Sequence, residues 1–487
     1  MKKILLILIC LMVLITGFSC QTDGPDPKKP DPVETGKLKI SVFLGGYGKA
    51  WIQTLASQFE AETGIEVSVE TNSSLPDQIP TRLEVGVGDD IFFSHGIKWE
   101  VPAVKNQILD ITDLYQQEVE DGVKLIDRID PGLLSTARLG DRYFKLPWTK
   151  GAGGLVYNAK LFDQYGWQIP TTFAELMALC QQIYSEARPT PLDSKKTIKP
   201  FVWSQEIYYW DYLMFDWWAQ LMGVEWFNDY VKLDSPALFN PSVNKFGVAF
   251  DYWSKLVAEN PWFSMESSDS KPYMAAQMDF INGYAAMIPN AHWLESEMRD
   301  SINPNRCEMR LMPTPFIPGA KINGAGQPIP VNYSVGAGDS VIIPANAPNK
   351  LEAKKFLLFL ARKSSCKTFT EKTNGTMLAM DYSGITFETG SITRFAQDIM
   401  QINMTAQKFN LYSNAPMFLG AKINPEWPIE GIQQYANYFA YYNNPQYFAN
   451  PSLWLSSNPR LNGEDFTSAQ YTTIVSRWNT WKNELGL

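Results

Sequence analysis

The stretch GGYGK, residues 45–49, lies between an apolar run and a helix-like run, which is where a phosphate-binding loop would lie. Such a loop has the pattern GxxxxGK followed by Ser or Thr, because the hydroxyl group must reach the magnesium ion. Here Ala50 follows the lysine, and the earlier glycines have the wrong spacing. A dinucleotide-binding turn would need a third Gly or Ala where the chain has Trp51. The stretch therefore does not predict a nucleotide site.

Pairs of carboxylates are the next candidates, since most glycoside hydrolases place one on each side of the scissile bond. The sequence offers Asp89 with Asp90, and Asp211 with Asp216. Helix capping or exposure to solvent explains these acids more simply, and the sequence has no GxSxG or HExxH motif. We therefore expect a protein that binds its ligand without converting it chemically. A surface-anchored glycan-degrading enzyme, a glycoside hydrolase, is the alternative.

Residues suited to a metal ion are scarce. His95 and His292 are the only histidines in the sequence, which is too few for a zinc-type site. A site built only from tyrosine and aspartate oxygens, of the kind that holds iron, stays open. We expect no metal ion and no other cofactor.

The cysteines do not form a recognisable pattern. Beyond Cys10 and Cys20, the chain has three, widely spaced: Cys180, Cys307 and Cys366. An odd number at such spacing indicates neither a disulfide framework nor a CxxC metal site. We expect buried free thiols, with one disulfide in an oxidising compartment as the open alternative.

Aromatic residues gather in one segment, where twelve of the thirty residues between 201 and 230 are aromatic. Packing is the first interpretation, because Trp210, Trp217 and Trp218 share a helical face. A sugar platform is the second, since the apolar face of a pyranose stacks on an indole ring. Its hydroxyl groups would then need acids and amides as partners. Such a mixture fits a neutral carbohydrate better than an anion, which would need an arginine cluster or bare helix N-termini.

The elements around the glycine-rich stretch can be read from the pattern. Residues 38–43 predict a buried strand, and residues 45–48 a tight turn. Residues 51–63 predict an amphipathic helix ended by the following glycine, and residues 65–69 a second strand. A βαβ unit places its first turn at the carboxyl edge of a parallel sheet, where ligands bind. Tyr47 in that turn would offer a ring face or a hydroxyl group.

Length and composition narrow the class of protein. The chain has 487 residues, enough for two domains, with ordinary hydrophobic and charged contents of 45% and 19%. Its net charge is −9 and it has no basic run, which argues against a nucleic-acid partner.

The N-terminus is typical of an export signal. Two lysines precede an apolar block, residues 4–15, that is too short to span a bilayer. Small residues then precede Cys20, as at a bacterial lipoprotein cleavage site. We expect a signal peptide over residues 1–19 and a lipidated tether over residues 20–36, which are rich in Pro, Asp and Gly. A plain secretory peptide is the alternative.

Several segments together resemble a known family. The first strand, glycine turn and helix ending FEAETGIEV resemble the start of extracellular solute-binding proteins of ABC transporters, of the sugar-binding kind related to maltose-binding protein. Further segments fit in the same order: DDIFFSHG (89–96), LPWTKGAGGLVYNAKLFDQYGWQIPTTFAEL (146–176), FINGYAAMIPNAHW (280–293) and SVIIPANAPNKLEAKKFLLFL (340–360). Each motif is weak alone, but five in order are specific.

The resemblance implies an α/β fold of the periplasmic-binding-protein-like type II, in which hinge strands join two α/β lobes around a ligand cleft. Lobe 1 would comprise residues 37–147 and 312–372, and lobe 2 residues 148–311 and 373–487. The Pro- and Gly-rich stretches near Pro147 and over residues 309–330 suit the crossings. The segment from 411 to 459 gives a poor helix signal.

The resemblance also implies a function and a site. It predicts high-affinity binding of a carbohydrate, an oligosaccharide in our expectation, and delivery to ABC transporter permease subunits. The protein would be extracytoplasmic, held at the bacterial cell membrane by lipid on Cys20. The family places cleft residues at strand ends, which here are Tyr47, Ser94, His95, Trp148, Trp203, Asp211, Asn290, Trp293, Gly338 and Asp339.

Overall fold

The computed structural model describes residues 36–86, 88–204, 209–336, 338–412 and 463–485. The predicted signal peptide, Cys20 and most of the tether lie outside these ranges, as does most of the segment from 411 to 459.

The predicted βαβ unit is confirmed. Strand β1 (Lys37–Phe43), helix α1 (Ala50–Thr63) and strand β2 (Glu66–Asn72) follow one another, and the two strands pair in parallel. Helix α1 ends at Gly64, whose φ of 72° is the left-handed conformation that glycine adopts without a Cβ clash. The buried residues of α1, Trp51, Ile52, Leu55, Ala56 and Phe59, are apolar, as an amphipathic helix requires.

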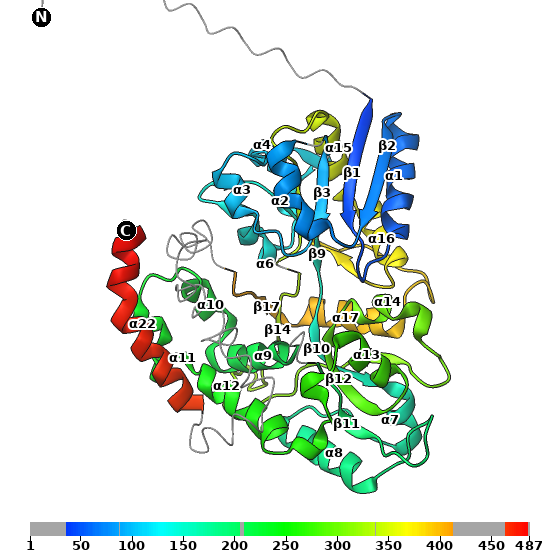
Figure 1. The fold of residues 1–487 in the computed structure, drawn as a ribbon, viewed down its shortest axis with the longest axis vertical. Coiled ribbons are helices and arrows are strands. Elements are labelled where there is room, and N and C mark those ends of the chain that lie inside the picture. Colours follow the sequence, from blue (N-terminus) through cyan, green and yellow to red (C-terminus); the bar gives the residue numbers. More distant parts are fainter. Residues whose placement is uncertain (1–35, 87, 205–208, 337, 413–462, 486–487) are drawn as a thin grey trace, which may run out of the picture. The chain divides into compact units, whose positions relative to one another are not determined.

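A five-stranded sheet extends this unit in the order β2-β1-β3-β15-β8. Figure 1 labels its first three strands, β1, β2 and β3. Strand β3 (Ile91–Ser94) is parallel to β1, whereas β15 (Ser340–Ile342) and β8 (Leu146–Pro147) complete an antiparallel edge. Because side chains alternate along a strand, Ile91 and Phe93 pack with the cluster that includes α1. Phe92 packs in another cluster, with residues of α2 (Leu75–Val85).

A second, four-stranded sheet has the order β11-β12-β10-β13. It is formed by β10 (Gly153–Asn158), β11 (Lys199–Phe201), β12 (Ala285–Ala291) and β13 (Met309–Leu311). All residues of β10 and β12 are buried, which agrees with their continuous apolar or small-residue sequences. Two α/β units with separate sheets therefore confirm the predicted fold class.

Helices pack around both sheets. The longer ones are α7 (Ala159–Tyr165), α8 (Phe173–Glu186), α9 (Trp210–Met222), α10 (Val224–Tyr230), α12 (Phe246–Trp253), α13 (Tyr273–Ile281), α15 (Lys350–Leu360), α16 (Lys363–Lys372), α17 (Arg394–Thr405) and α22 (Gly463–Leu485). Shorter elements are α3 (Glu100–Val104), α4 (Thr112–Tyr115), β4 (Glu118–Glu120), β5 (Val123–Lys124), α5 (Leu125–Arg128), α6 (Pro131–Leu134), β6 (Arg138–Leu139), β7 (Arg142–Tyr143), α11 (Pro241–Asn244) and α14 (Leu294–Glu297).

The aromatic segment is mainly core. Trp210, Trp217 and Trp218 on α9 are fully buried among other large side chains, so the packing interpretation holds for them. The indole nitrogen of Trp217 donates to the carbonyl of Pro315 over 3.0 Å, and that of Trp218 donates to the carbonyl of Asn244 over 2.5 Å. These partners satisfy the polar ends of the Trp217 and Trp218 rings inside the core.

The segments beyond residue 311 supply three of the four strands in two short pairs. Strand β9 (Thr149–Lys150) pairs with β16 (Met377–Leu378), and β14 (Val331–Tyr333) pairs with β17 (Gln407–Phe409). Met312 and Val331 pack with the core around α9. The side chains of β16 pack with the core around α1. The division into lobes at residues 147, 311 and 372 stays a prediction.

The three cysteines within the described ranges, Cys180, Cys307 and Cys366, are buried free thiols, as expected. None of the helices described has the length and apolar content needed to cross a membrane.

Candidate functional site

Three polar side chains from distant parts of the chain meet around one tyrosine hydroxyl group. Tyr47, in the turn between β1 and α1, donates to Oδ2 of Asp339 over 3.0 Å. Its hydroxyl also lies 3.1 Å from Oγ1 of Thr149 and 3.3 Å from Nε2 of His292. Asp339 precedes β15 in the first sheet, and His292 follows β12 in the second. This cluster therefore ties loops of the two sheets together.

Burial sets the protonation states in this cluster. It raises the pKa of Tyr47 well above its usual value, with a further contribution from the charge of Asp339, so the phenol stays neutral. It also raises the pKa of Asp339, although the hydroxyl group of Thr149 opposes the shift by donating to Oδ2 over 2.5 Å. Burial lowers the pKa of His292 to about 3, so its ring is neutral. Because both hydroxyls donate to Asp339, the phenolic oxygen can only accept from His292, which requires the tautomer that carries its proton on Nε2.

A second group consists of four partly exposed aromatic rings, which we call the aromatic cluster: Tyr209, Tyr212, Trp293 and Tyr333. The ring of Tyr209 lies 5.8 Å from that of Tyr212 and 5.5 Å from that of Trp293. Tyr212 also stacks against Tyr333 at 6.2 Å. A side chain at Gly46 would lie 3.1 Å from Cβ of Trp293, so the glycine turn permits close approach of its backbone to this cluster.

Two predicted site tryptophans are deeply buried. Trp148 is 1% exposed and packs in the first core, with its ring 5.7 Å from that of Trp51 and 5.5 Å from that of Phe93. Trp203 is 4% exposed, and its indole nitrogen donates to Oγ of Ser264 over 3.0 Å. Trp148 touches the site through its edge-to-face contact with Tyr47, at 5.1 Å. Both have packing roles, and a ligand contact by either stays a prediction.

Three more predicted site residues lie together because β15 runs antiparallel to β3: Ser94, His95 and Gly338. Ser340 pairs with Ser94, which brings Gly338 and Asp339 beside the end of β3. The side chain of Ser94 is buried and donates to the carbonyl of His95 over 3.1 Å. His95 and Gly338 are exposed. The predicted strand ends therefore do form one edge of the first sheet.

Asp211 and Asn290 lie near the aromatic cluster on α9 and β12. Oδ1 of Asp211 has no hydrogen-bond partner in the part of the chain that the structure describes, and burial raises the pKa of this carboxyl group to about 8. Asp211 is therefore mainly neutral at pH 7 and can both donate and accept. Asn290 is 1% exposed, and its Oδ1 accepts from the backbone nitrogen of Ala291 over 2.8 Å.

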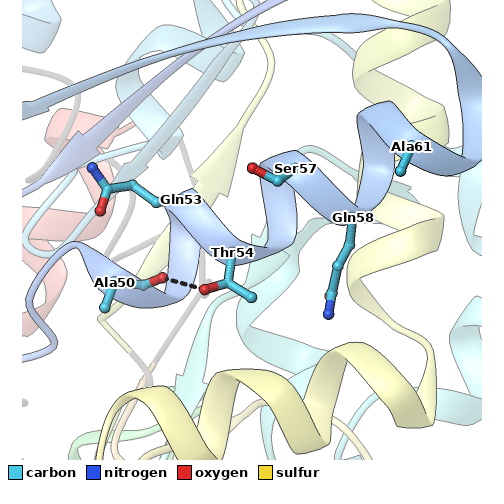
Figure 2. A pocket seen from close by; sticks show the side chains of 6 residues that line it. All are labelled: Ala50, Gln53, Thr54, Ser57, Gln58 and Ala61. Carbon is cyan, nitrogen blue, oxygen red and sulfur yellow. Dashed lines mark hydrogen bonds between the residues drawn. The ribbon is translucent and has the colours of Figure 1, made fainter.

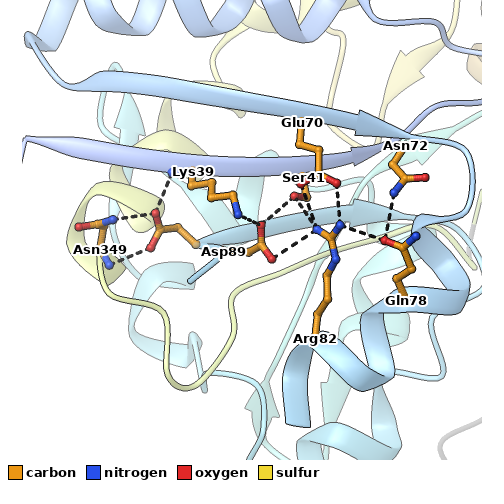
Figure 3. A network of polar contacts seen from close by, with 9 residues as sticks. Lys39, Ser41, Glu70, Asn72, Gln78, Arg82, Asp89 and Asn349 are labelled. Carbon is orange, nitrogen blue, oxygen red and sulfur yellow. Dashed lines mark hydrogen bonds and ion pairs between the residues drawn. The ribbon is translucent and has the colours of Figure 1, made fainter. Parts of the chain in front are cut away.

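The acids Asp89 and Asp90 have structural partners, and Figure 3 shows those of Asp89. Oδ1 of Asp89 accepts from Oγ of Ser41 over 2.8 Å, and its other oxygen lies 3.5 Å from Nη1 of Arg82. Asp90 accepts from the backbone and the side chain of Asn349, each over 2.8 Å, and so fixes the start of α15 against β1. These contacts support the structural reading of the two acids over a catalytic one.

Asp216 has a similar role at the crossing segments. This buried carboxylate accepts from Oγ1 of Thr314 over 2.5 Å, from Nδ2 of Asn332 over 3.1 Å and from the backbone nitrogen of Tyr333 over 2.7 Å. Nζ of Lys408 donates to Oδ1 of Asn332 over 3.0 Å. Asp216 thus fixes the strand that carries Tyr333, one ring of the aromatic cluster.

A shallow depression on the outer side of α1 is a weaker candidate (Figure 2). It is lined by short or uncharged side chains of this one helix: Ala50, Gln53, Thr54, Ser57, Gln58 and Ala61. The hydroxyl of Thr54 is already bonded to the carbonyl of Ala50. This surface has neither a ring for stacking nor a convergent set of polar groups, so we do not assign it a ligand.

Sequence reasoning missed five residues of these groups: Thr149, His292, Tyr209, Tyr212 and Tyr333. Thr149 and His292 are the chain neighbours of Trp148 and Trp293, which the resemblance did single out. Tyr209 and Tyr212 are three residues apart at the start of α9, a spacing that places them on one helix face. Nothing in the sequence around Tyr333 distinguishes it. Contact of any of these residues with a ligand stays a prediction.

Comparison with known proteins gives one family. Residues 45–365, about two thirds of the chain, match the family described as bacterial extracellular solute-binding protein. The diacetylchitobiose binding protein NgcE of Streptomyces coelicolor is 22% identical over 345 residues, which cover 69% of this chain and 68% of that protein.

Solved structures share the fold. One, from work on xylan utilisation by the thermophilic bacterium Caldanaerobius polysaccharolyticus, has a TM-score of 0.61 at 16% identity, over 90% of this chain and all of that one. The solute-binding protein RafE in complex with raffinose has a TM-score of 0.57 at 16% identity, over 85% of this chain and 99% of that one. At such identities the likeness establishes the periplasmic-binding-protein-like fold alone.

Proposed function

Because the chain belongs to the family of bacterial extracellular solute-binding proteins, we propose that it binds a carbohydrate with high affinity outside the cytoplasm and delivers it to the permease of an ABC transporter. The observation that carries this proposal is the aromatic cluster, whose partly exposed rings lie beside the neutral carboxyl group of Asp211. Diacetylchitobiose and raffinose, named for two of the similar proteins, are both neutral oligosaccharides.

The chemistry of the site suits a sugar. Aromatic faces contribute roughly 0.5–1.5 kcal/mol each beyond the burial of their area. A sugar hydroxyl both donates and accepts, as does the protonated carboxyl group of Asp211. The rings of Tyr212, Trp293 and Tyr333 come from α9, the end of β12 and β14. Rings spread over three elements can stack against more than one sugar unit, so we propose an oligosaccharide as the ligand.

We propose that residues 37–147 and 312–372 act as one lobe and residues 148–311 and 373–487 as the other, closing around the sugar. Crossings near Pro147 and Pro313 would absorb the backbone change. Tyr47, Ser94, His95, Gly338 and Asp339 would contribute from the first lobe. Trp203, Asp211, Asn290 and Trp293 would contribute from the second, with Trp148 at the crossing. Closure would let the permease distinguish loaded from empty protein.

We propose that lipid on Cys20 anchors the protein to the cell membrane after residues 1–19 are removed, and that residues 20–36 form the tether. Small residues before a cysteine and a Pro-rich segment after it support this anchor. The family supports a place outside the cytoplasm.

No observation favours the glycoside hydrolase. Asp89, Asp90 and Asp216 are engaged in structural hydrogen bonds. The proteins of the matched family are solute-binding proteins.

A thermal-shift screen tests the proposal, because a ligand that binds only the folded state raises its apparent stability by about 2.7 kcal/mol at roughly a hundredfold excess over Kd. The panel should include N,N′-diacetylchitobiose, raffinose and xylo-oligosaccharides, with inorganic phosphate and free amino acids as controls. We expect stabilisation by at least one oligosaccharide and none by the controls. Stabilisation by an amino acid or by phosphate instead would contradict a carbohydrate ligand.

A further inference from the structure

A small cavity, mainly apolar but with two buried amide side chains in its wall, lies between helix α13 and strand β12, next to the aromatic cluster. Its volume is about 10 Å3, which is near the least that one water molecule needs. Asn290 and Gln277 line it, together with the predicted site residue Trp203 and with Tyr209 of the aromatic cluster. Both amide side chains are 1% exposed. Buried amides at this depth need hydrogen-bond partners.

The orientation of the Asn290 amide is set by its surroundings. Its Oδ1 accepts from the backbone nitrogen of Ala291 over 2.8 Å, which only the oxygen can do. The other atom must therefore be the nitrogen, Nδ2. Nδ2 is buried and has no partner within the described ranges. Asn290 thus offers the cavity a hydrogen-bond donor.

The orientation of the Gln277 amide is set in the same way. Its Nε2 donates to Oε2 of Glu297 over 3.0 Å, which only the amide nitrogen can do. The other polar atom of the amide is therefore the oxygen, Oε1. Oε1 is buried and has no partner among the residues that the structure describes. Gln277 thus offers the same cavity a hydrogen-bond acceptor. The carboxyl group of Glu297 behind it makes the site unfavourable for an anion.

We propose that this cavity is a binding site for one uncharged hydroxyl-type oxygen, which accepts from Nδ2 of Asn290 and donates to Oε1 of Gln277. A hydroxyl group carries both functions on one atom and has the size of the cavity. A cation would face the amide N–H, and a methyl group would leave both amides unsatisfied. The oxygen comes from a hydroxyl group of a bound carbohydrate or from a water molecule. The carbohydrate source rests on the proposed function, whereas the water source does not.

High-resolution crystal structures of the full-length protein, alone and with N,N′-diacetylchitobiose, raffinose or xylotriose, separate the sources. We expect one oxygen within about 3.2 Å of both amide atoms. A water molecule in the sugar-free crystals identifies water as the source, and a sugar hydroxyl group that takes its place identifies the carbohydrate as the source. If none of the three sugars binds, the sugar-free crystals still decide. An oxygen-free cavity in every crystal form, or an amide turned away from it, overturns the proposal.

A double-mutant cycle gives an independent test in solution. Gln277→Met and Asn290→Leu each remove one partner of the shared oxygen with little change in side-chain length. We expect each single variant to lower the unfolding temperature. The loss in the double variant should be clearly smaller than the sum of the two single losses, because either change alone releases the oxygen. Gln181→Met, at an exposed position of α8, controls for methionine in a helix. Additive losses would show that the two amides act separately and would contradict a shared oxygen.

Discussion

The hydroxyl group of Tyr47 lies 3.0 Å from Oδ2 of Asp339, although 292 residues separate them in the chain. The same hydroxyl group lies 3.3 Å from the ring of His292, which follows a strand of the other sheet. One side chain from the glycine turn therefore joins the loops of both sheets. This is the role that the stretch GGYGK has in place of phosphate binding.

Tyr47→Phe should destabilise the protein by about 1–3 kcal/mol, because it removes a donor from the buried carboxyl group of Asp339. Equilibrium unfolding in urea measures the loss. Tyr184→Phe is the matched control, since its ring is 40% exposed and the change should fall within about 0.5 kcal/mol. Equal effects of the two variants would show that the Tyr47 hydroxyl contributes nothing specific.

Replacing two predicted site tryptophans should give different results. Trp148→Ala should cost about 3–5 kcal/mol of stability, because this ring fills the first core. Trp293→Ala should cost much less stability, because Trp293 is partly exposed, and should weaken sugar binding by about 1–3 kcal/mol. Chemical denaturation and calorimetric titration separate the two effects. A Trp293 variant that binds normally but unfolds early would make this residue a packing residue.

The local pattern of the sequence was enough for the first βαβ unit. Apolar alternation and Gly64 predicted β1, α1 and β2 closely, because these elements are stabilised by near neighbours in the chain. The clustering of Asp339 with Tyr47 was predicted only as far as both lie at strand ends. Their hydrogen bond depends on the antiparallel pairing of β15 with β3, a long-range contact that no local pattern encodes.

The site residues that the sequence did not indicate depend on long-range contacts in the same way. His292 joins the site because the second sheet brings the end of β12 to Tyr47, and the sequence records only that a histidine precedes Trp293. The resemblance singled out Trp148 for ligand contact, which stays a prediction, but did not show that its side chain is buried with Trp51 and Phe93. Ring burial depends on what packs from the other side of the sheet, which the spacing of tryptophans does not show.

The stability of the protein should depend on Asp211. Burial raises the pKa of this carboxyl group to about 8, whereas the unfolded chain has the usual value near 4. The folded state therefore retains a proton that the unfolded state loses, so this group's contribution to stability is complete below pH 4 and is lost as the pH rises to 8. The unfolding free energy of Asp211→Asn, relative to that of the natural chain, should therefore rise between pH 4 and pH 8. Above pH 8 this difference should stay constant.

Urea unfolding of both chains at several pH values between 4 and 9 measures this difference. Asp141→Asn, at an exposed turn, is the control for replacing an aspartate by asparagine. A stability difference for Asp211→Asn that does not change with pH would contradict the buried neutral carboxyl group.

Thiol counting should report on the lipid anchor. Cys180, Cys307 and Cys366 are buried, and burial raises the pKa of each thiol, so the folded protein should react slowly with a thiol reagent. After denaturation, membrane-extracted protein should show three thiols, because the leader with Cys10 is removed and lipid occupies Cys20. Cys20→Ser should release the protein from membranes or leave the leader uncleaved. Four thiols in the extracted protein would argue against lipidation.

Calorimetric titration with the oligosaccharide that stabilises the protein most in the thermal-shift screen is the sharpest test of the proposed sugar site. The natural chain should bind the oligosaccharide saturably, and the Trp293→Ala variant should bind it roughly 5- to 150-fold more weakly, which corresponds to about 1–3 kcal/mol. The variant's unfolding should remain close to that of the natural chain. Binding that is equally tight in both chains, or no binding of any carbohydrate by the natural chain, would contradict the proposed site.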